Sequence, residues 1–123
     1  MKSFQDEVAV STEEEATTVT SYFLREKYGI RVELKTIYLD SNVEVDLYGV
    51  TGDVCVFGEA AIRVGPSKVK DLLNKFDYAK KRFPEKLGDK VILVLYGLRI
   101  LPGVIEEAEK HGIWVVTASG EKN

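Results

Sequence analysis

Two apolar stretches that each contain a carboxylate decide how this chain folds: VEVDLY at residues 43–48 and VCVFGEAAI at residues 54–62. Both stretches have the β-branched and apolar composition of strands. Asp46 lies in the first and Glu59 in the second, and a carboxylate within an apolar strand costs free energy unless it is paired, hydrogen-bonded or bound to a metal ion. Magnesium prefers hard oxygen ligands and usually takes one or two carboxylates from a protein. The two acids therefore indicate a site for a divalent cation.

The residues around these strands predict a helix before them and a hairpin between them. Ser11 followed by Glu14 is a capping-box pattern, so a helix is expected over about 12–28. Alternating apolar residues from Ile30 onwards predict a first strand. The stretch GVTG at 49–52 predicts a hairpin connection between the two strands that carry the acids.

The second half of the chain predicts two more strands, each preceded by a helix. An apolar stripe from Ser67, a good N-cap, to Pro84 predicts the second helix. VILVL at 91–95 is typical of a parallel strand that is covered on both faces, and a connecting helix makes a right-handed crossover. A last helix over 102–111 and a strand over 113–117 complete the order αβββαβαβ. We therefore expect an α/β fold with a mixed five-stranded sheet flanked by helices.

Length and composition predict one domain over residues 1–123, with flexible ends at 1–10 and 118–123. Apolar residues make up 45% and charged residues 30% of the chain, and no apolar run is long enough to span a bilayer. No secretory signal is visible at the N-terminus, so we expect a cytoplasmic protein without membrane contact. The single cysteine, Cys55, is predicted to be buried and structural. The chain has no glycine-rich phosphate loop, so no organic cofactor is expected.

Charge is segregated along the chain. The net charge is −3, but residues 1–62 carry five basic and twelve acidic side chains, a net of −7. Residues 63–90 carry nine basic and four acidic side chains, a net of +5. This pattern would allow a positive surface that faces a polyanion beside an acidic metal site. A solvated, lysine-rich helix face explains it equally well.

The element order and the spacing of the acids resemble those of the PD-(D/E)XK nuclease-like superfamily, the fold of many restriction endonucleases and archaeal Holliday-junction resolvases. The resemblance is carried by Glu44-Val45-Asp46, Gly58-Glu59-Ala60-Ala61, a lysine-bearing helix, an apolar strand and AEKHGIWVVT at 108–117. These residues look most like those of archaeal members, and the likeness covers nearly everything from 11 to 117. It implies a restriction-endonuclease-like αβββαβ core with a further αβ unit at the C-terminus.

The resemblance also implies a set of metal ligands. Asp46, Glu59 and the backbone carbonyl of Ala60 would hold Mg²⁺ or Mn²⁺. An acid from the first helix commonly joins them, and the candidates are Glu13, Glu14 and Glu15. Glu14 is taken as the ligand, although favourable charge at a helix N-terminus explains an acid there at least as well.

The superfamily has a lysine two residues after the second acid, where this chain has Ala61. That lysine is assigned to the attacking water and to the charge that builds up on the phosphate, a role that alanine cannot fill. Arg63 lies on the same strand face as Glu59 and could supply positive charge, although a guanidinium is a poor base. A lysine of the second helix could also reach in, and Lys68 and Lys70 are nearest in sequence. The expected catalytic set is Asp46, Glu59, Arg63 and Lys68.

The function implied by the resemblance is Mg²⁺-dependent hydrolysis of phosphodiester bonds in DNA. Arg63, Lys68, Lys70 and Lys75 are then expected to contact the nucleic acid. The alternative is a catalytically inactive member of the fold that acts as a DNA- or protein-binding module or as a homodimeric scaffold. A homodimer is expected for this chain, and the sequence leaves both functions open.

Overall fold

The structure, a computed structural model, describes residues 4–123, with side chains from Thr12 onwards. Its elements in chain order are α1 (Phe4–Tyr28), β1 (Lys35–Asp40), β2 (Val43–Thr51), β3 (Val54–Val64), α2 (Pro66–Arg82), the 3-10 turn η1 (Pro84–Lys86), β4 (Lys90–Ile100), α3 (Val104–Lys110), β5 (Ile113–Thr117) and β6 (Gly120–Glu121). The strands form one sheet in the order β1-β2-β3-β4-β5-β6. The pairs β3–β4 and β4–β5 are parallel, and the other neighbours are antiparallel. The α/β class with a mixed sheet is confirmed.

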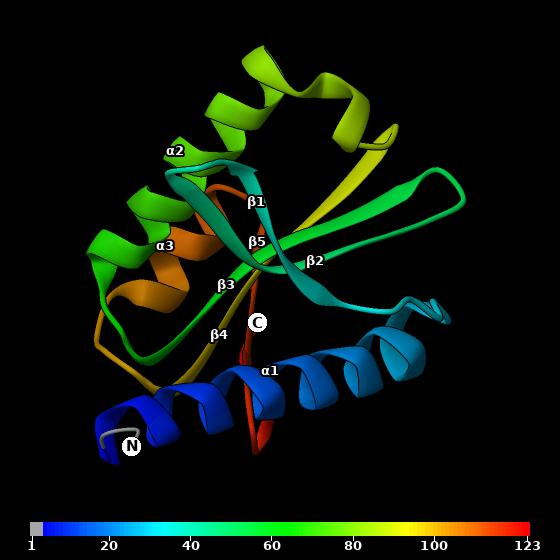
Figure 1. Ribbon diagram of the computed structural model, residues 1–123. Helices are drawn as coiled ribbons and strands as arrows, with labels where there is room; N and C mark the ends of the chain where they lie inside the picture. The colour runs from blue at the N-terminus through cyan, green and yellow to red at the C-terminus, as the bar shows by residue number, and fades with distance from the viewer. Residues whose placement is uncertain (1–3) are drawn as a thin grey trace.

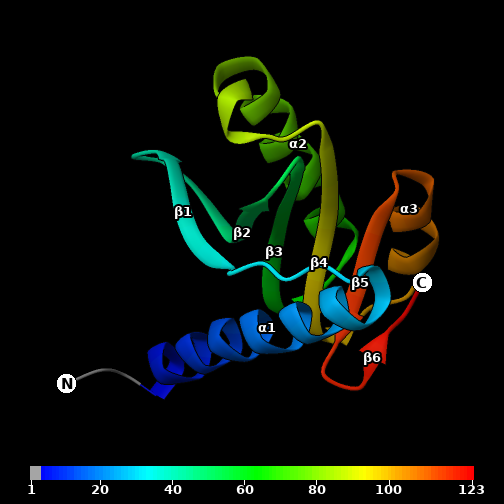
Figure 2. The ribbon, with the colours of Figure 1, turned by 90° about the vertical axis from the view of Figure 1, so that its right-hand side faces the viewer.

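Helices cover the sheet on both faces (Figures 1 and 2). On one face, α1 contributes Ala16 and Leu24 to an apolar cluster that also contains Trp114 of β5. On the other face, α2 and α3 pack on a second cluster, to which α2 contributes Leu72 and Ala79. Because both faces are buried, the central strands β3 and β4 are apolar almost throughout, as expected for parallel strands in such a fold. No helix within residues 4–123 is long and apolar enough to cross a bilayer.

Two helix starts differ from the sequence predictions. Helix α1 begins at Phe4, so the expected start near Thr12 was wrong and most of the expected flexible segment 1–10 is helical. Ser11 lies within this helix, where the capping-box pattern does not act as a start signal. Helix α2 begins at Pro66 with Gly65 at its N-cap, because proline is well suited to the first turn of a helix. Residues 1–3 lie outside the described part of the chain.

The C-terminal residues form a sixth strand, where the sequence predicted a flexible end at 118–123. Strand β6 pairs antiparallel with β5. The side chain of Asn123 accepts a hydrogen bond from the N–H of Val115 and donates one to the carbonyl of Ile113, both at 2.7 Å. Lys27 of α1 forms an ion pair with Glu121 at 3.0 Å. These contacts fix the C-terminus against β5 and α1, and the sheet therefore has six strands.

Candidate active site

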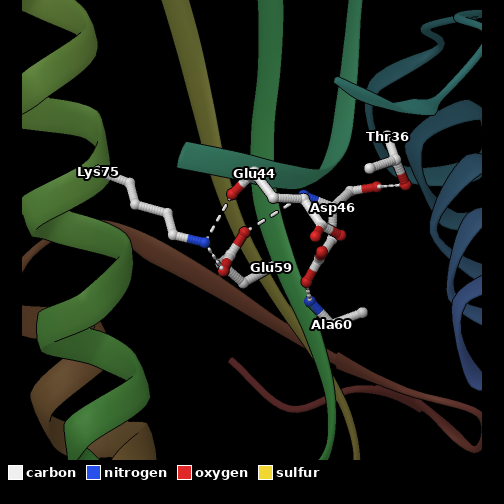
Figure 3. A network of polar contacts seen from close by, with 6 residues as sticks. All are labelled: Thr36, Glu44, Asp46, Glu59, Ala60 and Lys75. Atoms are coloured by element: carbon white, nitrogen blue, oxygen red, sulfur yellow. Dashed lines mark hydrogen bonds and ion pairs between the residues drawn. The ribbon is translucent and has the colours of Figure 1, made fainter. Parts of the chain in front are cut away.

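Strands β2 and β3 separate where the two predicted acids lie. Their ladder ends at the pair Leu47↔Gly58. Beyond it, carboxylates take the place of strand partners: the N–H of Asp46 donates to Oε2 of Glu59 at 3.2 Å, and the N–H of Ala60 donates to Oδ2 of Asp46 at 2.9 Å (Figure 3). Each acid thus satisfies a backbone donor that the opened ladder would leave without a partner. The acids converge because they bridge the gap between the two strands.

An irregularity in β2 directs the Asp46 segment away from regular pairing. Between the register pairs Lys35↔Tyr48 and Ile37↔Val45, β1 advances two residues and β2 advances three. The extra residue makes a β-bulge, which breaks the alternation of side chains between the two faces. Val45 consequently packs in the cluster under α2, while Leu47 packs in the cluster under α1. The bulge places Asp46 where its carboxylate can reach across to β3.

Glu59 is the most deeply buried acid of the site and is held by a lysine of α2. It is only 3% exposed. Nζ of Lys75 lies 2.6 Å from Oε1 of Glu59 and donates a second hydrogen bond, also 2.6 Å long, to the backbone carbonyl of Glu44 (Figure 3). Burial and the negative charge of Asp46 raise the pKa of Glu59, and Lys75 opposes that rise. The ion pair therefore stabilises the charged form of a carboxylate that has almost no contact with water.

A second group of acids lies beside this pair. One carboxylate oxygen each of Glu13, Glu44 and Asp46 lie within 4.8 Å of one another. A hydrogen bond to Asp46 raises the pKa of Glu44 to about 7, with further contributions from burial and from the charges of Asp46, Glu13 and Glu59. Burial and the charge of Asp46 also raise the pKa of Glu13. The mutual repulsion of these carboxylates favours either a shared proton or a cation between them.

The donor set fits a divalent cation that prefers oxygen. Oxygen ligands in an octahedral Mg²⁺ site, each at roughly 2.1 Å from the ion, lie about 3 to 4.2 Å from one another. The oxygens of Glu13, Glu44 and Asp46 all lie within 4.8 Å of one another, close to this range, so small side-chain rotations would suffice to share one ion. Glu13 comes from a long helix and the other two come from β2. The three side chains therefore converge from two separate elements of the fold.

The structure brings together some of the residues expected from the sequence and leaves others apart. Asp46, Glu59 and Ala60 meet at the opened ladder. Glu14 does not belong to the acid group, whose member from α1 is Glu13, and Glu15 accepts a hydrogen bond from the hydroxyl of Tyr96 instead. Within the described side chains, no hydrogen bond or ion pair joins Lys68 or Lys70 to these acids. The lysine that reaches them is Lys75.

From the sequence, Lys75 is expected only to contact nucleic acid, and Glu44 is not expected at the site. A signal for Lys75 was present in the helix periodicity. Leu72 and Ala79, three residues before it and four residues after it, are fully buried members of the apolar stripe. Residues at these spacings share one face of a helix, so Lys75 lies on the side of α2 that faces the sheet. Glu44 had no comparable signal, because its side-chain direction depends on the irregular pairing of β2.

The acid group is accessible through a cleft. The cleft has a volume of about 250 Å³ and is lined by Thr12, Glu13, Ala60, Ala61, Ile62 and Arg63. Glu13 belongs to the acid group, and Ala60 is hydrogen-bonded to Asp46. Arg63, expected from the sequence to supply positive charge, is exposed on the cleft wall. A ligand in this cleft could contact both the acids and the arginine.

Comparison with protein-family models gives a match to a domain of unknown function, DUF8196, over residues 14–123. The chain belongs to this family. Among solved structures, the DUF8196 chain is similar to a repair endonuclease from Pyrococcus abyssi, with 22% sequence identity and a TM-score of 0.52. The similar region covers 80% of this chain and 44% of the endonuclease chain, so the DUF8196 chain spans less than half the length of that neighbour. No curated protein matches the DUF8196 chain. The structural likeness shows the fold, a restriction-endonuclease-like core, and confirms that part of the sequence-based expectation.

Proposed function

We propose that this chain is a metal-dependent nuclease of the PD-(D/E)XK type that hydrolyses phosphodiester bonds in DNA. The observation that carries the proposal is the contact of Lys75 Nζ with Oε1 of Glu59 at 2.6 Å. It brings an amino group to Glu59 although Ala61 occupies the position where the superfamily motif has its lysine. The proposal treats residues 1–123 as one nuclease-like domain.

Asp46, Glu59, the carbonyl of Ala60, Glu13 and Glu44 would hold Mg²⁺ or Mn²⁺, with Glu13 in the place that the sequence assigned to Glu14. The ion, when bound, supplies Lewis-acid polarisation of the phosphate and lowers the pKa of a coordinated water. Glu59 accepts one hydrogen bond at each of its oxygens, and a carboxylate has about four acceptor positions. It therefore keeps the capacity to coordinate an ion while it remains paired with Lys75.

Lys75 has the geometry for the role of the missing lysine. Its ammonium group has three donors, and two of them are used by Glu59 and by the carbonyl of Glu44. Its side chain remains 28% exposed, so solvent reaches it. The third N–H is available to orient a water molecule or to stabilise negative charge that develops on the phosphate. The Glu44 carboxyl, with a pKa of about 7, exchanges a proton near neutral pH.

DNA is the substrate class that we propose, on two grounds. The fold is shared with a repair endonuclease, and the segment 63–90 that supplies Lys75 has a net charge of +5.

A second function has one observation in its favour, because both oxygens of Glu59 already accept hydrogen bonds from donors of this chain, as in a purely structural ion pair. In that case the chain is an inactive module that binds DNA or a protein. A homodimeric scaffold is the third possibility, and exposed Tyr22, Tyr28 and Tyr38 are candidate contacts for it.

Cleavage assays on supercoiled, linear and branched DNA with Mg²⁺, Mn²⁺ or EDTA test the proposal. We expect metal-dependent cleavage that falls at least 100-fold in Lys75→Met and Asp46→Ala. The matched control, Lys68→Met, removes a lysine of the same helix without an ion pair to the acids and should stay within about threefold of wild type. Asp46→Ala should also abolish the heat of metal binding in calorimetry. Intact DNA with retained binding would instead support the inactive module, and a stable dimer without DNA binding would support the scaffold.

A further inference from the structure

Two arginines lie directly opposite each other at the end of the parallel pair β3–β4. Arg63 and Arg99 are register partners, so their side chains project from the same face of neighbouring strands. Both are exposed, and within the described side chains neither forms an ion pair with an acid. Like charges directly opposite each other destabilise a sheet. This pair of guanidiniums is therefore best balanced by an anion from outside the chain.

Arg63 connects the arginine pair to the acid group, because Arg63 also lines the cleft. Arg63 lines the cleft together with Ala60 and Glu13. Arg63 follows Glu59 by four residues on β3, a separation of about 13 Å at roughly 3.3 Å per strand residue. An extended ligand that reaches the acids through this cleft therefore passes Arg63, whose register partner is Arg99.

The strand edge along the cleft offers an additional hydrogen-bond donor. After Gly58, β3 continues to Val64 without a ladder partner in β2. The N–H of Ala60 points towards β2, since it donates to Asp46. Ile62, two residues further on, presents its N–H and C=O to the same side because strand directions repeat every two residues. The Ile62 N–H therefore faces the cleft, where it can donate to an anion.

We propose that Arg63 and Arg99 together bind a backbone phosphate of a nucleic-acid strand, farther along the same strand from the phosphate that lies at the acids. This inference rests on the proposed function and identifies how the site holds its substrate. Guanidinium groups match phosphate oxygens through pairs of parallel N–H donors, which a single lysine cannot do. Arg63 is exposed on the wall of the cleft and Arg99 is exposed on the neighbouring strand, which suits a polymer that continues past the site. They act as positioning residues and lie away from the reacting atoms.

The test is the salt dependence of DNA binding in EDTA, measured by fluorescence anisotropy with a labelled oligonucleotide. Each phosphate contact contributes about 0.9 to the slope of log K against log salt for duplex DNA and about 0.7 for a single strand. We expect the slope to become shallower in Arg63→Gln and in the Arg63→Gln/Arg99→Gln double variant. The change should equal the contribution of about one phosphate contact. The control is Arg31→Gln, which removes the same charge beyond the C-terminal end of α1 and should leave the slope unchanged. An unchanged slope in the double variant, or an equal loss in the control, would overturn the inference.

Further readouts separate a phosphate site from a structural role and from a failure of the proposed function. Removal of one of the two facing positive charges should leave the melting temperature of the arginine variants equal to or higher than that of wild type. A loss of DNA binding together with a lower melting temperature would therefore count against the phosphate site. Arginine-dependent DNA binding without cleavage would refute the nuclease and support the phosphate site. Cleavage with an unchanged KM in the double variant would support the nuclease and refute the phosphate site. Equal, arginine-dependent affinity for a polyglutamate peptide would refute phosphate recognition.

Discussion

Replacement of Lys75 by methionine tests the central ion pair through stability, independently of any enzymatic activity. Methionine keeps the length of the apolar part of the side chain and removes the charge. The variant leaves Glu59, only 3% exposed, without its cation. The remaining hydrogen bond from the N–H of Asp46 cannot compensate, because it satisfies one oxygen and carries no formal charge.

The expected magnitude follows from the burial of the two partners. Removal of one member of a fully buried ion pair costs about 3–5 kcal/mol. The side chain of Lys75 is 28% exposed and Glu59 can take up a proton, so we expect a loss of about 2–4 kcal/mol at pH 8. Without Lys75, the pKa of Glu59 rises further above its ordinary value of about 4.3. The folded variant then binds a proton that the unfolded chain releases, and its stability falls as pH rises above that value. The difference from wild type should therefore grow between pH 5 and pH 8.

Urea unfolding followed by the fluorescence of Trp114, the only tryptophan in the chain and 5% exposed, measures this difference. Lys68→Met serves as the control and should change stability by less than about 0.5 kcal/mol. The double variant Lys75→Met/Glu59→Gln should recover most of the loss, because it removes the unpaired charge. If Lys75→Met unfolds at the same urea concentration as wild type at pH 8, the ion pair does not stabilise the fold.

Three more predictions concern the acid group and the two ends of the chain. Mg²⁺ binding should be about tenfold weaker at pH 6 than at pH 8, because the ion must displace the proton that Glu44 holds with a pKa of about 7; equal calorimetric affinities at the two pH values would contradict this. Asn123→Ala should lower the free energy of unfolding by about 1–2 kcal/mol through the loss of two hydrogen bonds to β5, and an unchanged urea midpoint would show that the C-terminus is not held there. Tyr96→Phe should cost about 1–2 kcal/mol, since the hydroxyl of the buried Tyr96 donates to the carboxylate of Glu15; the same change in a Glu15→Gln background should cost less.

The fold and the two central acids could be predicted from the sequence because the signals are local. Alternation and apolar runs define the strands, and Asp46 and Glu59 are conspicuous because they interrupt them. Consecutive strands joined by a tight hairpin lie side by side, so the acids had to be neighbours. The bulge in β2 has no such signal, since it depends on how β1 and β2 share their register.

Distance along the sequence points to Lys68 and Lys70, whereas distance in the fold points to Lys75. Strand β3 ends at Val64 and α2 then runs back along the sheet. Glu59 lies five residues before the end of β3, about 16 Å at roughly 3.3 Å per residue. A helix rises about 1.5 Å per residue, so Lys75 returns about 14 Å from Pro66, whereas Lys68 returns only about 3 Å. The residue that meets Glu59 therefore comes from the middle of the helix, and the sequence contains enough information to select it.

The choice among the acids of α1 could not be made in this way. Neighbouring residues of a helix differ by about 100° in direction, so Glu13, Glu14 and Glu15 point to three different sides. Only the crossing of α1 over the sheet decides which of them faces Asp46. That crossing depends on tertiary packing, which local patterns do not encode.

The apolar environment of Ala61 limits where a lysine can stand in this architecture. Its methyl group packs against the cluster under α2, the same layer from which Lys75 reaches Glu59. A long cationic side chain at 61 would compete with Lys75 both for space and for the same carboxylate. In related chains, the residues at positions 61 and 75 should therefore vary together. A small residue should occupy the strand position whenever the helix position carries the lysine. A search that requires the strand lysine would overlook such chains, whereas one that accepts either arrangement would find them.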